Sequence, residues 1–590
     1  MSKLLLFVAC VLLVNIVTAD IYLHNPRGNN NRNCERGENR QNENRLFDSE
    51  NNAKGGYACP RTRGVAFTPQ MYYYQGSQLQ VEWSQQHACG GNVNCQIVLQ
   101  YMCEDTAPYI RDGIPTDITD GTGTNTPTAA DINNPDVGFN ESPSNLARCK
   151  ARQRNGGLYT ADQTINGQSA VFTRQNPNGQ TSGLECQEER DYYPYWHPSP
   201  WKDIAIFTTN VTMCPYYQAE SQNVMSKGEC VKANGDPLSF NQRQTCLSGN
   251  GIWNVTEPYN IAPPDCLPIT NVASRDNHLG SVLGGQLAGY NWTIPNDIRN
   301  TCVLRIRYNI SSSDFNNWEI DSSKNGANAP VKDRPYMDFG LSQPLGMAIN
   351  TDQLGRTFQD RTYTFGIKQR PSNIRFYDKI YNLNVRGKRG NIVQTFPAVE
   401  YDFVPNFLMV QGGDYVHLQW TGSDYNPNRN PNDGEGGPFE GSDRHNFVQT
   451  DSLTANIPRL VQNANMFKLE NGDVNATLFQ RLALLDQNVR ECLNITALRA
   501  KNNNNEDAAG RDRLNCGKLN NVGVYFDAGL IRQVVSGKFS YMSTRNNNFS
   551  NRSQKGLLVV QNGWYNSAYS NKNTQLALVV AVLVAVIMVL

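Results

Sequence analysis

The uneven distribution of cysteine constrains the fold of this chain more than any other feature of its sequence. There are 15 cysteines in 590 residues, and Cys10 lies in a hydrophobic leader, which leaves 14 for the rest of the chain. Twelve of these lie between Cys34 and Cys302, and only Cys492 and Cys516 lie beyond them. Seven disulfides could form from the 14 in an oxidising compartment, and we predict that Cys492 pairs with Cys516. The chain is therefore expected to be exported, with an N-terminal part held together by disulfides.

Residues 1–19 have the layout of a signal peptide. Lys3 supplies the positive charge, a short apolar stretch follows, and Val17 and Ala19 suit the −3 and −1 positions of a cleavage site. We expect cleavage after Ala19, so that Asp20 becomes the first residue of the mature protein.

The chain ends in an uncharged apolar stretch, Leu576–Leu590. As a helix it would span roughly 22 Å, which is short of the hydrocarbon core of about 30 Å. A polar spacer and the small triplet Asn566-Ser567-Ala568 precede it. This is the layout of a GPI-anchor signal, so we predict lipid attachment at Asn566, within residues 566–590. A short C-terminal transmembrane anchor is the alternative.

Charge and glycosylation motifs agree with an extracellular protein. The formal net charge is zero, whereas a nucleic-acid partner would require a concentrated basic face, so none is expected. We expect the protein on the extracellular face of the plasma membrane, or secreted, with glycans or proteins of the matrix or cell surface as its partners. Nine Asn-x-Ser/Thr motifs suit a glycosylated exterior: Asn140, Asn210, Asn254, Asn291, Asn309, Asn475, Asn494, Asn548 and Asn551.

Alternating apolar residues predict a mainly β protein with three segments. Residues 20–270 form a Cys-rich, loop-rich region whose best strands are "QLQVEW" and "CQIVLQYMC". Residues 271–370 contain "CVLRIRYNI" and "RTYTFGIKQ", a pattern typical of an antiparallel sandwich. Residues 371–565 continue with "IYNLNVRG", "AVEYDFVP" and "FLMVQGGDYVHLQW".

Two local patterns refine these segments. Four cysteines, Cys214, Cys230, Cys246 and Cys266, follow one another at intervals of 16, 16 and 20 residues, which predicts a small stapled subdomain. One helical insertion near 475–516 is predicted by apolar residues at i+3 and i+4 steps, with Asn475 or Thr477 available as N-cap. These apolar residues are Leu478, Leu482, Leu485, Val489, Cys492 and Leu493.

Two stretches resemble each other, "QGSQLQVEW" and "QGGDYVHLQW". Each runs from a Gly turn through an alternating strand to a tryptophan. They are either equivalent strands of two sandwiches or similar by chance, and their length does not decide between the two.

Residues 371–565 resemble a cupredoxin domain. The resemblance rests on "FVPNFLMVQGGDYVHLQW", "DRHNFV" and "SGKFSYMSTRNNNFSNRSQKGLLVV". It implies His445 as the first copper ligand, but Ser543 stands at the Cys position, Asn546–Asn548 at the second His position and Gln554 near the axial position. Type 1 copper requires thiolate and imidazole, so the resemblance supports the fold and argues against the metal. The predicted fold is a disulfide-stapled, sandwich-like N-terminal region followed by a cupredoxin-like sandwich with a helical insertion.

The other candidate metal ligands are His24, His87 and His197. The early "HNPRG" and a histidine after the "VEW" strand resemble copper-dependent polysaccharide monooxygenases, in which an N-terminal histidine chelates copper through its amine and its ring. Cleavage after Ala19 leaves four residues ahead of His24, so His24 lacks the free amine. The alternative is an ordinary site in which the three histidines converge. We expect no cofactor.

The stretch "DYYPYWHPSPWKDIAIF" is the densest in aromatic residues. Tyr195, Trp196 and Trp201 could stack on the apolar faces of sugar rings. The alternative, which the loop-rich context favours, is that these rings fill a core.

Several longer motifs are similar to a family of secreted or surface glycoproteins of social amoebae that is associated with development and has relatives in aquatic invertebrates. They are "YLHNPRGNNNR", "NNAKGGYACPR", "LQYMCED", "YYPYWHPSPWKDIAIFT", "CVLRIRYNISSSDF" and "STRNNNFSNRSQKG". The resemblance implies an extracellular location and transfers no catalytic residue. We therefore predict a non-enzymatic cell-surface or matrix glycoprotein with a recognition or structural role, in which glycans are the candidate ligand and the copper site is degenerate. The alternative is a secreted copper-dependent oxidase that acts on polysaccharide.

Overall fold

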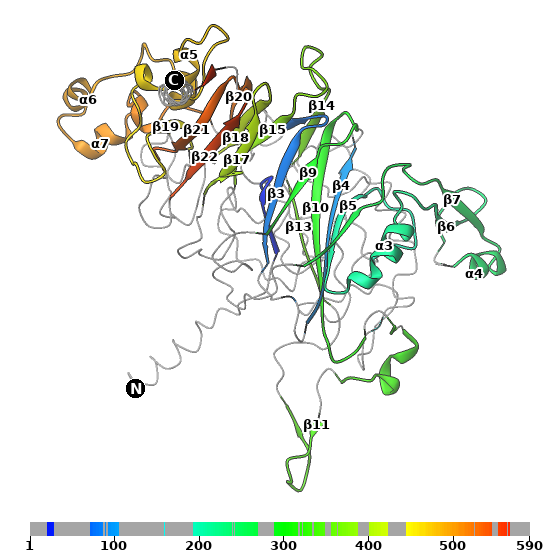
Figure 1. Cartoon of the computed structure of the whole chain (residues 1–590). Coiled ribbons are helices and arrows are strands. Elements are labelled where there is room, and N and C mark those ends of the chain that lie inside the picture. The colour runs from blue at the N-terminus through cyan, green and yellow to red at the C-terminus, as the bar shows by residue number, and fades with distance from the viewer. Residues whose placement is uncertain are drawn as a thin grey trace, which may run out of the picture.

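The computed structural model describes two sandwiches that share one sheet (Figure 1). It describes residues 21–28, 71–104, 193–269, 288–347, 356–386, 401–422, 444–545 and 553–566, with short gaps inside these ranges, and Tyr159. The predicted mainly β fold with several disulfides is confirmed.

The first sheet is the outer layer of the N-terminal sandwich. Its core pair is the long antiparallel ladder between β10 and β4, with Cys302 opposite Cys103. β-branched and aromatic residues alternate along both strands, which suits a pleated sheet buried on both faces. The strands are, in sheet order, β2 (Tyr72–Tyr74), β14 (Phe365–Lys368), β10 (Arg299–Ser312), β4 (Val93–Cys103), β5 (Lys202–Thr208) and β8 (Asp265–Pro268), with β13 (Arg356–Arg361) paired to β10.

The second sheet runs through both halves of the chain. Tyr381 on β15 pairs with Gln78 on β3, and this one ladder position joins the N-terminal strands to the C-terminal strands. Figure 1 shows β3, β15, β18 and β20 following one another from the middle of the molecule to the upper left. The strands in order are β1 (Ile21–Asn25), β3 (Gln78–Gln85), β15 (Ile380–Val385), β18 (Tyr415–Thr421) and β20 (Tyr525–Arg532), with β9 (Ala288–Thr293) on β3 and β16 (Phe403–Val404) on β15.

The third sheet closes the C-terminal sandwich. Buried residues of its strands, among them Leu558 and Tyr541, belong to the same apolar cluster as Leu418 and Trp420 of β18. Its strands are β17 (Phe407–Gln411), β22 (Lys555–Gln561), β21 (Val535–Met542) and β19 (Val448–Thr450), with β23 (Tyr565–Asn566) on β21.

The shared sheet uses opposite faces in its two halves. Leu79 and Trp83 of β3 lie in the N-terminal core, whereas Leu383 of β15 lies in the C-terminal core. Side chains alternate between the two faces of a strand. Because Tyr381 pairs with Gln78, Leu383 points to the same face of the sheet as Gln78 and to the opposite face from Leu79. The C-terminal half of the sheet therefore turns a second, polar face toward the first sheet. The functional candidates lie along this face and its edges.

Five disulfides link the described cysteines, and Cys492–Cys516 is confirmed. Cys103–Cys302 joins β4 to β10, so the boundary drawn near residue 270 divides what is one sandwich. Strands from before and after residue 270 are neighbours in both sheets. Local sequence patterns do not reveal this long-range pairing.

The predicted stapled subdomain is present at the right of Figure 1, held by Cys214–Cys266 and Cys230–Cys246. Its elements are η3 (Val211–Met213), α3 (Cys214–Glu220), β6 (Lys227–Val231), α4 (Arg243–Ser248) and β7 (Ile252–Thr256). Further short elements follow in the N-terminal half: η5 (Ser322–Lys324), η6 (Gly326–Asn328), β11 (Tyr336–Met337) and β12 (Leu345–Gly346).

The helical insertion is real, but it is three short helices and not one. Asn475 caps the first helix by accepting a hydrogen bond from the Leu478 amide, as predicted. The helix ends where Leu485 takes a left-handed conformation. Val489 keeps the helical spacing of apolar residues in the sequence, but it lies beyond the end of the helix. The elements are α5 (Ala476–Leu484), α6 (Ile495–Lys501) and α7 (Glu506–Arg511), with η7 (Val461–Asn463) before them and η8 (Cys516–Lys518) after them.

The two similar stretches form β3 and β18, which lie on either side of β15 in the shared sheet. β3 contributes to the N-terminal core and β18 to the C-terminal core. The leader, residues 1–19, and the C-terminal stretch Leu576–Leu590 lie outside the described residues. Within the described part of the chain, no helix is long and apolar enough to cross a membrane.

Candidate functional site at the domain interface

The "HNPRG" motif forms a turn that points Arg27 at the C-terminal sandwich. Leu23 donates its amide hydrogen to Asp360 Oδ2 at 2.8 Å, and Gly28 donates to the Leu23 carbonyl at 3.0 Å. A Cβ on Gly28 would lie 2.3 Å from Asp360 Oδ2, so only glycine fits there. His24 faces the opposite way from its neighbours in β1, into the sheet region of Ser84.

Arg27 lies against His445, the first expected copper ligand. The guanidinium Nη2 donates to His445 Nε2 at 3.5 Å, and His445 Nδ1 donates to Gln554 Oε1 at 3.0 Å. The ring of Tyr401 lies 5.0 Å from the imidazole and 5.9 Å from the guanidinium carbon. Trp420 Nε1 donates to the His445 carbonyl at 2.8 Å and fixes its backbone. All four neighbours thus hold one orientation of the imidazole.

The other positions of the degenerate copper site also meet here. The Ser543 amide donates to the Gln554 carbonyl at 3.0 Å. Asn446 Oδ1 accepts hydrogen bonds from the Thr544 amide at 2.8 Å and from Ser543 Oγ at 3.4 Å. The structure therefore brings His445, Ser543 and Gln554 together, as the resemblance implied. Asn546–Asn548, at the second His position, lie outside the described residues.

The residues at this place do not fit copper. Ser543 supplies a hydroxyl where type 1 copper requires a soft thiolate, and the carboxamide of Gln554, near the axial position, does not replace that ligand. His445 Nδ1 carries a hydrogen that it donates to Gln554, and Nε2 faces the cationic Arg27. Neither ring nitrogen presents a lone pair to a metal ion in this arrangement.

His24 and His197 do not converge with His445. His24 Nε2 lies 2.8 Å from Ser84 Oγ and is fully buried. His197 is also buried and donates through Nδ1 to the Pro198 carbonyl at 2.8 Å. His87 lies outside the described residues. In the ranges that the structure covers, no three His, Cys, Asp or Glu side chains gather as a metal site would require.

The aromatic stretch covers the outer face of the first sheet. Tyr195 and Trp201 are 7% and 1% exposed, and Trp196 is half-buried. Side chains buried to this degree cannot offer a ring face to a sugar, so Tyr195 and Trp201 are core residues and the three-ring platform does not form. Trp196 alone of the three keeps exposed ring area.

Beneath this cover lie two buried arginines. Arg305 donates through Nε and Nη2 to Gln100 Oε1 at 3.0 and 2.6 Å, and its guanidinium stacks 4.0 Å from the Trp201 ring. Arg307 donates to the Tyr195 hydroxyl at 3.3 Å. Both arginines are at most 1% exposed. Planar guanidinium groups suit such stacked, hydrogen-bonded positions, so the aromatic stretch stabilises the buried charges by stacking and hydrogen bonding.

Asp203 is the carboxylate of this network. It accepts hydrogen bonds from Gln100 Nε2 at 2.7 Å and from the hydroxyls of Tyr193 and Ser221. Burial raises the pKa of Asp203 above its usual value, and these hydrogen bonds with the nearby Arg305 oppose that rise. The network is closed on itself, which is the arrangement of a structural core.

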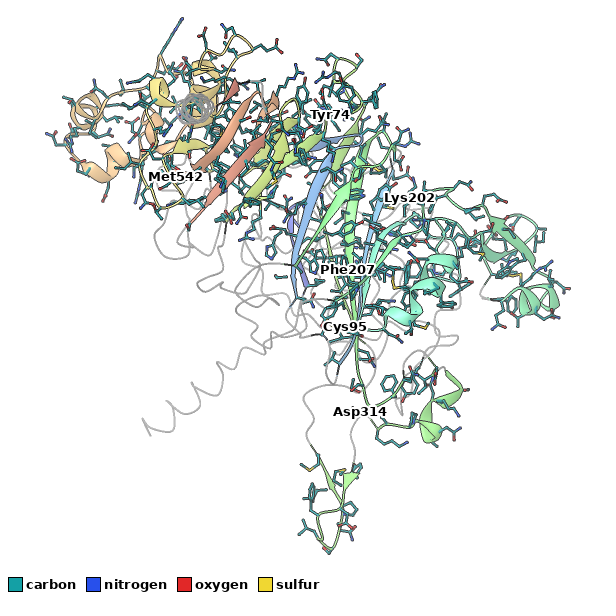
Figure 2. The ribbon with its side chains drawn as sticks, in the orientation of Figure 1. Tyr74, Cys95, Lys202, Phe207, Asp314 and Met542 are labelled. Carbon is teal, nitrogen blue, oxygen red and sulfur yellow. A yellow bond between two sulfur atoms is a disulfide. The ribbon has the colours of Figure 1, made fainter. Side chains whose placement is uncertain are left out.

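A histidine that the sequence analysis did not single out lies at the centre of the domain interface. His417 on β18 is fully buried, with Nε2 3.3 Å from Asp527 Oδ1 and Nδ1 3.2 Å from Asn382 Oδ1. Tyr72, from β2 of the N-terminal sandwich, donates its hydroxyl to Asp527 Oδ2 at 2.7 Å. The Tyr72 amide also donates to Gln419 Oε1 at 3.1 Å. Figure 2 marks the place through the neighbouring Tyr74, whose ring lies 5.3 Å from that of His417.

The signal for this cluster was present in "DYVHLQW", where His417 and Gln419 alternate with apolar residues. Such alternation ordinarily predicts a solvated outer face. Here a strand of the other domain covers the face. Burial alone would raise the pKa of Asp527, but hydrogen bonds from His417 and Tyr72 hold it below its ordinary value.

A second buried charge cluster bridges the domains. Arg386 Nη1 lies 3.3 Å from Glu82 Oε2, and Arg386 Nη2 lies 3.9 Å from Asp402 Oδ2. Burial raises the pKa of Asp402 to about 7, against the attraction of Arg386 and a hydrogen bond from Asn406, with Glu82 adding to the rise. Burial raises the pKa of Glu82 as well, opposed by Arg386. One guanidinium thus serves two buried carboxylates.

Beside the Arg27 turn, both domains line a small pocket that includes Pro26, Tyr73, Phe365 and Val385 and has room for little more than one water molecule. Arg27 is the charged residue of its lining, so the pocket offers no set of metal ligands.

The predicted glycosylation sites differ in access. Asn254, Asn291 and Asn494 are exposed. Asn309 lies within β10, where its amide donates to Gln96 Oε1 at 3.0 Å, which suits glycosylation least. Asn210 and Asn475 are half-buried, and Asn140, Asn548 and Asn551 lie outside the described residues. Asn566, the predicted anchor position, lies in β23, paired with Ser536.

Two family models match the chain. One, described as the DD3-3 N-terminal domain, matches residues 19–367, and the other, described as the DD3-3 cupredoxin-like domain, matches residues 378–560. No curated protein and no solved structure matches significantly. The first match treats the N-terminal sandwich as one unit, as the sheets do, and the second confirms the cupredoxin-like half. Since the first match alone covers more than half of the sequence, this chain belongs to the DD3-3 family, with a cupredoxin-like domain as its C-terminal half.

Proposed function

We propose that this protein is a non-enzymatic recognition or structural glycoprotein of the cell surface or matrix, in which the cupredoxin-like domain is a docking domain and not a redox centre. The observation that carries the proposal is the position of Arg27 against His445. A segment of the N-terminal sandwich fills the place where the family fold would hold a metal.

A guanidinium at this place disfavours a copper ion directly. A copper ion bound at His445 Nε2 would have to displace the Arg27 guanidinium, whose Nη2 lies 3.5 Å from that nitrogen and which carries charge of the same sign. Arg27 is only 4% exposed, so this charge lies within the interface of the two domains. The arginine therefore serves as a fixed buried cation that links the two domains.

Several observations support an extracellular setting. Disulfides such as Cys103–Cys302 persist in oxidising compartments. Exposed sequons such as Asn254 and Asn494 could carry glycans. A lipid anchor at Asn566, added when the apolar stretch Leu576–Leu590 is removed, would provide the membrane attachment.

Metal content of the purified mature protein tests the proposal. We expect inductively coupled plasma mass spectrometry to find no stoichiometric copper. The copper content should also not change in His24→Ala or His445→Ala. Stoichiometric copper that is lost in either variant would overturn the docking role and favour the copper-dependent oxidase. Arg27→Met is a sharper variant, because it removes the cation while keeping the bulk, and it should still bind no copper.

Glycan recognition is the ligand class that we propose for the surface. Trp196 is its remaining aromatic support, because Tyr195 and Trp201 are buried. A glycan array with Trp196→Ala as the matched variant tests this class. Binding lost in Trp196→Ala at unchanged thermal stability would support it, and no binding by the wild type would remove glycans from the proposal.

A further inference from the structure

The hairpin of β11 and β12 carries an unusual concentration of exposed apolar side chains. Figures 1 and 2 show it at the bottom of the molecule, beyond Asp314 and apart from the three sheets. A two-stranded hairpin this short is marginal on its own. Within residues 336–347 the exposed fractions are 78% for Tyr336, 44% for Met337, 59% for Phe339, 58% for Leu341, 46% for Leu345 and 40% for Met347.

These side chains surround the hairpin on both faces. Tyr336 pairs with Gly346 and Met337 pairs with Leu345. Since adjacent strand residues point to opposite faces, Tyr336 lies on one face and Met337 with Leu345 on the other. Phe339 and Leu341 lie in the turn between the strands. A protein partner typically covers one face of such an element, whereas lipid surrounds an inserted tip.

The charge of the hairpin and its exposed apolar side chains both suit contact with lipid. Asp338 is the charged residue of the hairpin, and its Oδ1 accepts a hydrogen bond from the Gly340 amide at 2.8 Å, so the carboxylate is turned onto the backbone of the turn. The exposed apolar side chains of the hairpin form one patch, and such patches mark contacts with a protein or a membrane.

We propose that residues 336–347 insert into the headgroup region of a zwitterionic lipid surface. Tyr336 and Phe339 suit the boundary between headgroups and acyl chains, where aromatic rings concentrate. The open edges of a two-stranded hairpin keep insertion shallow, because unpaired backbone groups are too costly in the hydrocarbon core. The hairpin contains no basic residue, so anionic lipid is not required. The proposed lipid anchor at Asn566 would bring the hairpin to such a surface, but insertion does not depend on whether the cupredoxin-like domain binds copper.

A fluorescent label tests insertion in the full chain. Leu341→Cys, labelled with an environment-sensitive dye, should shift to shorter wavelength and brighten about twofold or more with phosphatidylcholine vesicles. Bromine atoms placed near the top of the acyl chains should quench it. The matched control is labelled Ile457→Cys, an 80% exposed apolar position of the cupredoxin-like domain, which should not respond. No response at position 341, or an equal response at both positions, would overturn the proposal.

Vesicle partitioning of unlabelled variants gives a second readout. Phe339→Asp with Leu341→Asp should lower the partition coefficient about tenfold. The control pair Ile457→Asp with Leu460→Asp changes side chains that are 80% and 61% exposed and should leave partitioning unchanged. Both pairs should keep the wild-type thermal transition, since these side chains are exposed. Equal partitioning of the two double variants would overturn lipid insertion. A dye response at position 341 that appears without vesicles, and only at high protein concentration, would also overturn it. Such a response would indicate that the hairpin contacts a second copy of the chain.

Discussion

Two sheets of this molecule bury charged or polar side chains on the face opposite an apolar core, and they differ in what covers that face. On the first sheet, Arg305 and Arg307 lie under the aromatic stretch of the same domain. On the C-terminal half of the shared sheet, His417 and Asp527 lie under β2 of the other domain. The first cover closes a domain, and the second joins two domains.

This difference determines which contacts fix the relative placement of the two sandwiches. Apolar clusters hold each sandwich, and they would tolerate many relative positions of the two. The interface instead depends on directional contacts from Arg27, Tyr72 and Arg386. A buried polar group left unpaired costs more than a typical hydrogen bond contributes, so each contact fixes one arrangement. The comparison predicts large effects on global stability from the first face and effects on domain coupling from the second.

Removing the charge under the aromatic cover should have the largest effect. Arg305→Ala leaves Gln100 and Asp203 buried without their cation, so we expect the free energy of unfolding to fall by about 3–5 kcal/mol. Arg299→Ala on the same strand is the control, because its side chain is 53% exposed and should cost less than about 1 kcal/mol. Chemical denaturation measures both. Similar losses for the two variants would mean that the aromatic cover does not depend on the buried charge.

Removing the cation between the domains should have the next largest effect. Arg386→Ala leaves Glu82 and Asp402 buried together, so we expect a loss of about 3 kcal/mol and a thermal transition that separates into two. Arg499→Ala removes an exposed pair with Glu506 and serves as control. Scanning calorimetry provides the measurement. A single transition at an unchanged temperature would contradict the linking role of this cluster.

The same cluster predicts a dependence on pH. Because the folded-state pKa of Asp402 is raised to about 7, folding favours its protonated form. Its stabilising contribution is therefore full below the unfolded pKa near 4 and is lost as the pH rises through 7. Between pH 7 and pH 5 we expect a gain of about 2 kcal/mol from this group.

The measurement is the difference between wild type and Asp402→Asn, in which the contributions of the other titratable groups cancel. The thermal transition of the wild type should rise relative to that of Asp402→Asn as the pH falls from 7 to 5. Parallel curves for the two proteins would show that Asp402 is already neutral at pH 7 or ionised throughout.

Local patterns predicted the elements well because their causes are local. Alternation located β3, β4, β10 and β18, and a side-chain cap at Asn475 located the start of α5. The cupredoxin motifs placed His445, Ser543 and Gln554 near one another. These signals depend on residues a few positions apart, which a sequence displays directly.

The remaining features depend on residues far apart in the chain. Nothing in "HNPRG" shows that Arg27 will lie against His445, 418 positions later. The polar face of "DYVHLQW" gave the strand but not its cover, because Tyr72 comes from the other sandwich. The helix prediction extended past Leu485 because apolar spacing does not encode a left-handed residue. The aromatic stretch looked like a ligand platform because sequence does not reveal the arginines beneath it.

The smallest expected effect isolates a single contact between the domains. Tyr72→Phe removes the hydroxyl that donates to Asp527 Oδ2 at 2.7 Å and keeps the ring, which lies 5.0 Å from that of His417. We expect a loss of about 1.5 kcal/mol, the low end of the range for a hydrogen bond to a charged acceptor, because Asp527 keeps its contact with His417. Tyr415→Phe is the control, because the contact that its ring makes with Arg532 survives the change. If the loss for Tyr72→Phe disappears in an Asp527→Asn background, the hydroxyl acts through that carboxylate. A loss that persists in the Asp527→Asn background would come from the packing of β2. The contact between the domains would then depend less on oriented hydrogen bonds than we infer from the two buried faces.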